Sequence, residues 1–137
     1  MTYSPKVSRL FLALVILQAI HSIEEYIGKL WDNFPPATYV CSLVSDDLHF
    51  GFLVINIGLF VLGILCWLFL VRTNHNLAIL PLGFWIFIEL VNGIGHPIWT
   101  IVQKGYTPGV ITAPFLLLVA ILLIKAICDG RARSLKS

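Results

Sequence analysis

The sequence predicts an all-α integral membrane protein, a bundle of four transmembrane helices formed by a single domain over residues 1–137. Hydrophobic residues make up 58% of the chain and charged residues only 12%, which is far from the balance of a soluble domain. The apolar residues gather in four stretches, at about 7–27, 48–71, 77–102 and 110–127, each 18 to 26 residues long. A helix needs about 20 residues to cross the hydrocarbon core. The short segments of alternating polarity that a transmembrane barrel requires are missing.

The first stretch begins after Pro5 and ends with a polar segment, His21–Glu25. Tyr26 and Trp31 follow this segment, and aromatic residues of this kind mark the interface between membrane and water. We therefore expect His21–Glu25 to lie just inside the membrane, in the outer third of the first span.

The longest connection, residues 28–47, is too apolar for a free linker, and Pro35 with Pro36 interrupts any long helix. We expect an ordered outer loop that folds over the mouth of the bundle. Ser45 or Asp46 then provides the N-cap that starts the second span. The fourth span carries hardly any polar side chain beyond Thr112, which is typical of a scaffold helix.

The placement of the basic residues predicts the orientation of the bundle. With four spans, only Lys29 and Lys104 fall on one side of the membrane. The other side receives Lys6, Arg9, Arg72, Lys125, Arg131, Arg133 and Lys136. Because loops rich in lysine and arginine stay in the cytoplasm, both termini are expected there, in the inner membrane of a bacterium. The basic tail then anchors the topology, and we expect no nucleic-acid partner.

Three ionisable side chains inside the first span are the most informative feature of the chain. A charged residue near the middle of a span costs about 2.5–3.5 kcal/mol, so such residues usually face the protein interior and one another. At about 100° per residue, Glu24 and Glu25 lie on either side of His21, on one face of the helix. This arrangement indicates a buried functional site.

A second polar set lies on the third span, where Glu89, Asn92 and His96 follow one another at spacings of three and four. They therefore form one stripe on a helix. The second span adds His49, and counting from the ends of antiparallel helices places all these residues in the outer half of the bilayer. The two polar sets are expected to meet, with Glu89 at the bottom of the site.

The chain also resembles a named family on these residues. An apolar helix that ends in H-x-x-E-E (His21, Glu24, Glu25), followed later by E-x-x-N-x-x-x-H, is similar to the small bacterial membrane proteins of the HXXEE family. The turn Tyr106–Gly109 also fits this resemblance. The resemblance implies a multi-pass membrane protein with a functional centre at the motif. It implies no reaction, because the function of the family is not established.

Imidazole and carboxylate groups that meet inside a helical bundle suit one divalent metal ion, either zinc, iron or manganese. The predicted ligands are His21, Glu25 and His96, with His49, Glu24 or Glu89 as a fourth ligand or base. The chain lacks the paired Glu-x-x-His motifs of di-iron bundles and the H-E-x-x-H motif of zinc proteases.

A metal-free alternative uses the same residues for acid–base catalysis. Glu24 or Glu25 would act as the acid or base, His96 would relay protons, and Asn92 would orient the substrate. In either case the protein would be an intramembrane enzyme whose substrate, a lipid or isoprenoid-like molecule, enters from the bilayer. This assignment as an enzyme stays open at the level of the sequence.

Two further functions remain open. Buried Glu and His residues also conduct protons or ions, and such a role, like transport, would favour a homo-oligomer. Alternatively, the polar residues hold the helices together in a structural or accessory subunit of a membrane complex.

Overall fold

The computed structural model describes residues 3–134, which form helices and no strand. The elements in chain order are α1 (Pro5–Ile27), α2 (Leu30–Asn33), α3 (Pro35–Ser42), α4 (Leu48–Cys66), α5 (Ile79–Gln103) and α6 (Ala113–Ser134). A π-helical turn, Trp67–Val71, extends α4, and a 3₁₀ turn, Asn76–Ala78, precedes α5. The predicted all-α fold class is therefore confirmed.

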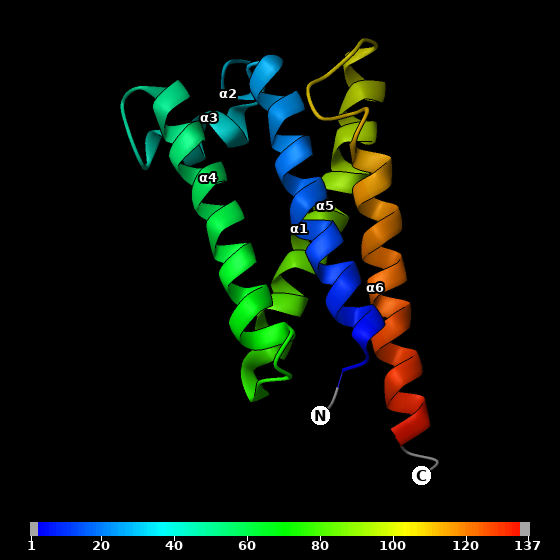
Figure 1. Ribbon diagram of the computed structural model, residues 1–137. Coiled ribbons are helices and arrows are strands. Elements are labelled where there is room, and N and C mark those ends of the chain that lie inside the picture. Colours follow the sequence, from blue (N-terminus) through cyan, green and yellow to red (C-terminus); the bar gives the residue numbers. More distant parts are fainter. Residues whose placement is uncertain (1–2, 135–137) are drawn as a thin grey trace.

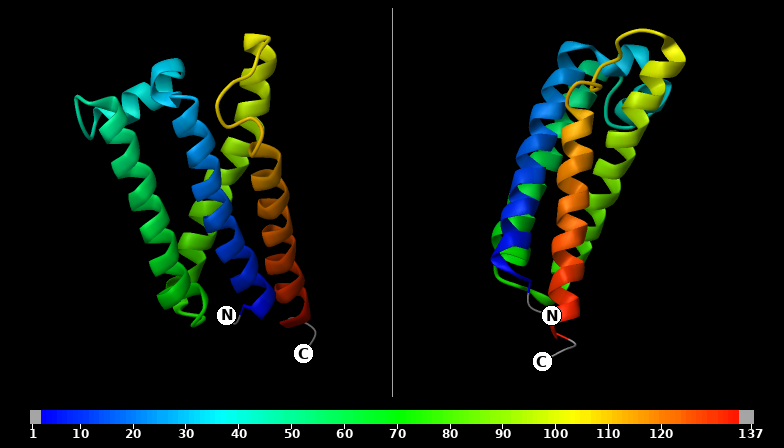
Figure 2. Two further views of the ribbon diagram at one scale, coloured as in Figure 1. Left: turned by 45° about the horizontal axis from the view of Figure 1, so that its top comes forward. Right: turned by 90° about the vertical axis from the view of Figure 1, so that its right-hand side faces the viewer.

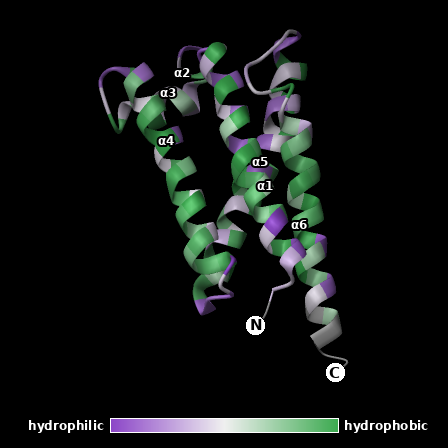
Figure 3. Ribbon diagram, viewed as in Figure 1, coloured by the Kyte–Doolittle hydropathy of each residue, from purple (hydrophilic) through white to green (hydrophobic). Residues whose placement is uncertain are grey.

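Four helical segments are long and apolar enough to cross a membrane: Pro5–Ile27, Leu48–Val71, Asn76–Gln103 and Ala113–Gly130. In Figure 3 the ribbons of these helices are coloured mainly as hydrophobic, and hydrophilic colour lies mostly in the connections and toward the ends of the helices. The fourth helix begins at Ala113, slightly later than the apolar stretch suggests. The preceding residues form a turn whose backbone N–H groups bind Glu24 instead of continuing the helix.

The four long helices run side by side, and both ends of the described chain lie at the same end of the bundle (Figure 1). We call this the termini end. The opposite end, which we call the loop end, holds α2, α3 and the connection of residues 104–112. α1 packs against α4 and α6, while α5 passes behind α1 and packs along α6 (Figure 2). At Gly93 the two helices come so close that a Cβ would lie 2.6 Å from the Cβ of Leu117.

The half of the bundle nearer the termini is filled by an apolar core. Phe11, Leu14, Leu82 and Leu123 are fully buried there, and Trp85 packs edge-to-face on Phe11 with ring centroids 5.6 Å apart. Such close packing leaves no room for polar groups. The buried polar side chains are consequently gathered in the other half, nearer the loop end.

The connection between α1 and α4 is ordered, as the sequence predicts. Its two short helices bury Trp31 and Cys41 against Phe52 of α4, and the hydroxyl of Thr38 donates a hydrogen bond to the carbonyl of Trp31 at 2.6 Å. The N-cap of α4 is Asp47, whose carboxylate accepts from the N–H of Phe50 at 3.2 Å. The expectation of Ser45 or Asp46 as this cap was therefore wrong by one or two residues.

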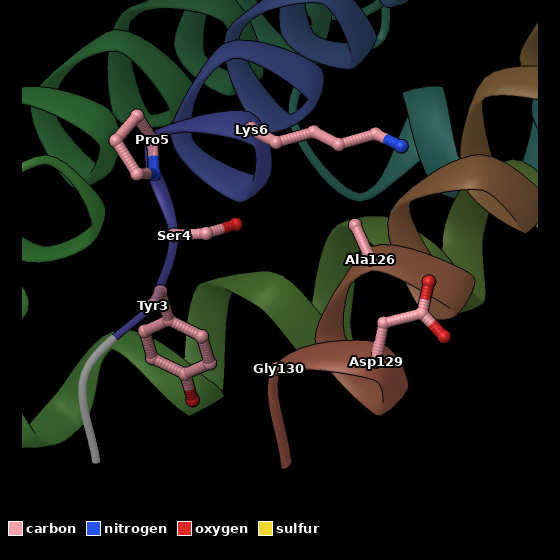
Figure 4. Close-up of a pocket in the computed structure, with 7 residues that line it drawn as sticks. All are labelled: Tyr3, Ser4, Pro5, Lys6, Ala126, Asp129 and Gly130. Carbon is pink, nitrogen blue, oxygen red and sulfur yellow. The ribbon is translucent and has the colours of Figure 1, made fainter. Parts of the chain in front are cut away.

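A hollow of about 370 Å³ lies at the termini end, between the start of α1 and the last turns of α6 (Figure 4). It is lined by Tyr3, Ser4, Pro5, Lys6, Ala126, Asp129 and Gly130. This hollow lies at the surface, across the apolar core from the buried polar residues.

Candidate metal centre

Two histidines and one glutamate meet in the loop half of the bundle. His21 and Glu25 come from α1, and His96 comes from α5. The Oε1 atom of Glu25 lies 3.3 Å from Nε2 of His21 and 3.2 Å from Nε2 of His96. The two imidazole rings stand at 82° to each other with centroids 4.8 Å apart. The exposed fraction is 0% for His21, 6% for Glu25 and 7% for His96, so all three residues are buried.

The positions of these residues follow from helical periodicity. His21 and Glu25 are four residues apart, so they lie one above the other on the face of α1 that packs into the bundle. His96 lies on the buried face of α5, two turns along from Glu89, which is also fully buried. The amphipathic pattern of α1 thus directs His21 and Glu25 toward α5, and the pattern of α5 directs His96 toward α1.

Glu24 points away from this cluster and binds the turn before α6. Its carboxylate accepts hydrogen bonds from the N–H groups of Ile111 (3.0 Å) and Thr112 (2.9 Å), from the Thr112 hydroxyl (2.6 Å) and from the Tyr106 hydroxyl (3.0 Å). Burial and the bond to Glu24 raise the pKa of Tyr106, so it remains a donor. An anion beside backbone N–H groups at the start of a helix is electrostatically favoured. Glu24 therefore fixes the turn of residues 106–112.

Thr112 connects Glu24 to His21 and thereby determines which ring nitrogen of His21 carries a proton. Its single hydroxyl proton goes to the Glu24 carboxylate, and its oxygen lies 2.6 Å from Nδ1 of His21. At that distance Nδ1–H must be the donor. In neutral His21 the other nitrogen, Nε2, then presents a lone pair to the centre of the cluster.

This arrangement leaves lone pairs opposed. Nε2 of His21 faces the Glu25 carboxylate at 3.3 Å without hydrogen-bond geometry, and it has no other partner. Nδ1 of His96 is also buried without a partner. Unpaired polar atoms in a protein interior are costly, and two facing acceptors repel. A positive ion or a proton between Nε2 of His21 and the Glu25 carboxylate removes the repulsion between these two acceptors.

Gly109 makes room for the two imidazole rings. A Cβ on this residue would lie 2.6 Å from Cε1 of His96 and 2.8 Å from Cε1 of His21. Its φ angle is +91°, a conformation that other residues rarely adopt. The turn before α6 therefore packs on the two histidine rings through the backbone of Gly109, without a side chain between them.

A second group of polar side chains lies next to the cluster, toward the termini end. The side-chain amide of Gln18 is oriented with its nitrogen toward Glu89. This nitrogen donates hydrogen bonds to both carboxylate oxygens of Glu89, at 2.7 and 2.8 Å. Asn92 also donates to Glu89, at 3.3 Å, and the Ser22 hydroxyl donates to Asn56 at 2.7 Å. Glu89 is thus fully buried but has amide partners.

The donor set fits a transition-metal ion. The three residues each offer a ligand atom, and these atoms lie within 4.8 Å of one another. Two imidazoles with one carboxylate suit zinc, iron or manganese and leave further coordination positions open. The hydrogen bond from Nδ1–H of His21 to Thr112 is the kind of outer contact that orients a histidine ligand. His21, Glu25 and His96 can therefore hold one metal ion.

Of the site residues predicted from the sequence, three form the cluster, two lie beside it and two lie elsewhere. His21, Glu25 and His96 form the cluster, while Glu89 and Asn92 lie beside it in the Gln18 group. The other two lie outside: Glu24 binds the turn before α6, and His49 bonds through Nε2 to the Tyr26 hydroxyl at 2.7 Å. Glu24 and His49 are thus not among the three residues whose side chains could hold a metal ion.

Sequence reasoning did not identify the roles of Gln18, Thr112 and Gly109. Gln18 had a detectable signal, because it lies three residues before His21 and seven before Glu25, on the same helical face. In the predicted span of residues 110–127, Thr112 and Lys125 are the polar residues, and Thr112 is the one near the loop end. For Gly109, only the resemblance of the turn to the family pointed to this position.

Cys41 lies close to the cluster, and its reactivity provides a test of the packing at the loop end. Burial raises the pKa of the Cys41 thiol, and the negative charge of Glu25 adds to this effect. Because the thiolate is the reactive species, Cys41 should react with iodoacetamide much more slowly than the exposed Cys128. Peptide mass spectrometry of the labelled protein measures both rates. Equal rates would contradict the packing of α3 over the cluster.

The comparisons with known proteins identify a family without a known activity. No curated protein and no solved structure matches the chain. A family model described as "Protein of unknown function with HXXEE motif" matches residues 12–124, which include His21, Glu25 and His96 and the turn that covers them. Since this match covers far more than half of the chain, the protein belongs to this HXXEE family.

Proposed function

We propose that this protein is an intramembrane enzyme with one divalent metal ion held by His21, Glu25 and His96, and that its substrate is an apolar, lipid-like molecule. One observation carries the metal assignment. The Glu24–Thr112 hydrogen bond makes Nδ1 of His21 a donor, so in neutral His21 the Nε2 lone pair points at the Glu25 carboxylate inside a buried site. A cation held by His21, Glu25 and His96 would replace this repulsion with coordination.

Zinc, iron or manganese bound there would act as a Lewis acid toward a polar group of the substrate. The residues of the chain have other tasks. Thr112 holds the ring of His21 by its hydrogen bond, and the turn at Gly109 covers the ligands on the side of α6. Asn92 and Gln18 present amides beside the cluster. These amides suit a substrate that is apolar except for one polar functional group.

The substrate class follows from the surroundings of the cluster. The ligands lie among four helices that are long and apolar enough to span a membrane, away from both ends of α5. Molecules that partition into the bilayer reach such a site without leaving the hydrocarbon. A water-soluble substrate would have to cross the ordered cover formed by α2, α3 and the turn of residues 106–112.

Proton or ion conduction receives less support. A conducting path needs polar groups or water along the whole bundle. Between Glu89 and the termini end, the described residues instead form an apolar layer that contains Phe11, Leu14, Leu82 and Trp85. This layer favours a site that is closed toward the termini end.

We also propose that the termini end faces the cytoplasm of a bacterium. Lys6, Arg9 and Arg72 lie at that end, whereas Lys29 and Lys104 lie at the loop end. The positive-inside rule then places the metal ligands in the half of the bilayer farther from the cytoplasm.

The metal content of the detergent-purified protein tests the proposal. Elemental mass spectrometry is expected to find close to one zinc, iron or manganese ion per chain. The double variant His21→Ala, His96→Ala should lose this metal almost completely, because a single carboxylate remains. The His49→Ala variant is the matched control, since His49 bonds to Tyr26 outside the cluster, and it should retain the metal.

Circular dichroism and size-exclusion chromatography establish that both variants remain folded and monodisperse. Wild-type protein without metal, also after incubation with each ion, would contradict the metal centre. Glu25 between two imidazoles would then act in metal-free proton transfer, the second function that this geometry supports.

A further inference from the structure

An apolar groove leads from the surface of the bundle to the metal ligands. It lies between α4 and α5, beneath α3, and has a volume of about 280 Å³. α4 packs on α1, and α5 packs on α6, but α4 and α5 make few contacts with each other. The groove fills the seam between them. Because both helices are long and apolar enough to span a membrane, a seam between them would open toward the lipid of the bilayer.

The lining of the groove changes from apolar to polar across its width. Its walls are formed mainly by Phe52, Ile55, Leu59, Ile88 and the α3 residues Val40 and Cys41. On its inner side the groove reaches Glu25 and His96, together with the amides of Asn56 and Asn92. Few polar groups at one side of an apolar site fix the orientation of a ligand.

We propose that this groove binds a single hydrocarbon chain of a membrane lipid, and that it holds the polar group of that lipid against Glu25 and His96. The inference rests on the proposed function and names the substrate class of the same site. The ligand is an amphiphile with a long acyl or isoprenoid chain. It enters sideways from the bilayer through the seam between α4 and α5.

The size of the groove selects a chain over a bulkier ligand. Pockets for drug-sized molecules have volumes of about 300–1,000 Å³, and this groove lies at the lower limit of that range. Phe34, Pro36 and Ala37 line it near the loop end, and Leu59 and Ile88 are its lining residues farthest from the loop end along α4 and α5. From Phe52 to Leu59 the lining extends over about two helical turns, which suits one flexible chain.

Asn56 and Asn92 provide the first polar contacts for a lipid that enters the seam. The side chain of Asn56 is held by its donation to the carbonyl of Phe52 at 3.0 Å and by acceptance from Ser22. Asn92 is held by Glu89. Both amides are thus fixed before any ligand binds, which lowers the entropic cost of binding a hydroxyl or carbonyl group.

Photo-crosslinking of the full-length protein in liposomes tests the groove. The probe is a long-chain fatty alcohol that carries a diazirine in the middle of its chain. Crosslinks in the wild-type protein are expected to be enriched on Phe52, Ile55, Leu59 and Ile88 over exposed positions such as Val91 and Phe69. In the variant Ile55→Trp, whose indole fills the groove, crosslinking to Leu59 and Ile88 should fall about tenfold, which corresponds to 1.4 kcal/mol of binding.

The matched control is Ile57→Trp. Ile57 lies two residues further along the same helix, about 200° around it, and is 59% exposed toward the lipid. This variant should keep the wild-type crosslinks, so that a general effect of an added tryptophan is separated from filling of the groove. Crosslinks spread evenly over the lipid-facing surface, or unchanged in Ile55→Trp, would overturn the proposal.

Metal analysis of the same samples separates the two proposals. Ile55→Trp leaves His21, Glu25 and His96 in place and should retain its metal. Enriched crosslinks in a protein that binds no metal would support the groove while contradicting the metal centre. A metal-loaded protein without enriched crosslinks would support the metal centre and overturn the groove.

Discussion

Replacing Gly109 with alanine is expected to disrupt the candidate metal centre more than any other single-methyl change. The added Cβ would lie within 2.8 Å of both imidazole rings, at a backbone position with φ of +91°. Overpacking of an interior costs about 1–3 kcal/mol, and a non-glycine residue in a disfavoured conformation costs about 1–3 kcal/mol. We expect the free energy of unfolding to fall by about 2–6 kcal/mol and the bound metal to be lost.

Thermal unfolding followed by circular dichroism, together with elemental analysis, measures both effects. Gly105→Ala is the matched control, because it lies in the same connection and a Cβ there would meet only the carbonyl oxygen of Gln103, at 3.9 Å. That variant should keep its stability and its metal. If Gly109→Ala had wild-type stability and metal content, the close contact between the turn and the histidines would be refuted.

The Thr112→Val variant is expected to weaken metal binding by about 10–100-fold, the usual effect of removing a partner that orients a histidine ligand. Valine has nearly the shape of threonine but cannot accept the Nδ1–H of His21 or donate to Glu24. His21 then loses the hydrogen bond that selects its tautomer. Titration of the metal-stripped protein with zinc, in competition with a chelator of known affinity, measures the change.

Thr112→Ser keeps the hydroxyl and should restore most of the affinity. This comparison distinguishes a positioning role from a packing role, because serine lacks the methyl group and valine lacks the hydroxyl. Strong zinc binding by the valine variant and weak binding by the serine variant would mean that the methyl group, rather than the hydrogen bond, supports His21.

The sequence was sufficient to predict which part of the bundle holds the site. Ionisable side chains are expensive in a membrane span, so those in the first and third spans had to face inward. Helical spacing then placed His21 with Glu25 and Glu89 with His96. The depths counted along the first and third spans, which run in the same direction, agreed, and the structure brings His21, Glu25 and His96 together.

Periodicity alone could not separate the roles of the two adjacent glutamates. Glu24 and Glu25 lie about 100° apart on α1, and either one was a reasonable ligand. Their roles depend on α6, because the N–H groups of Ile111 and Thr112 attract Glu24 and leave Glu25 to the histidines. The position of a turn 87 residues away in sequence is not encoded in the local pattern of α1.

His49 illustrates the same limit. Its depth in the second span matched that of the other polar residues, but depth does not determine the direction in which a side chain points. In the structure, α4 diverges from α5 toward the loop end, and His49 reaches Tyr26 rather than Glu25. The groove between α4 and α5 results from the same divergence.

The sequence by itself determined that this protein is a four-span helical bundle and that its ionisable residues are gathered in one half of it, because hydrophobicity and helical spacing are local properties. Only the tertiary structure decided which residues share the cluster, which tautomer neutral His21 adopts and where the groove between α4 and α5 lies. Those features depend on contacts between helices that are far apart in the chain. The residue pattern of a single helix does not specify how such helices cross or how far apart they lie.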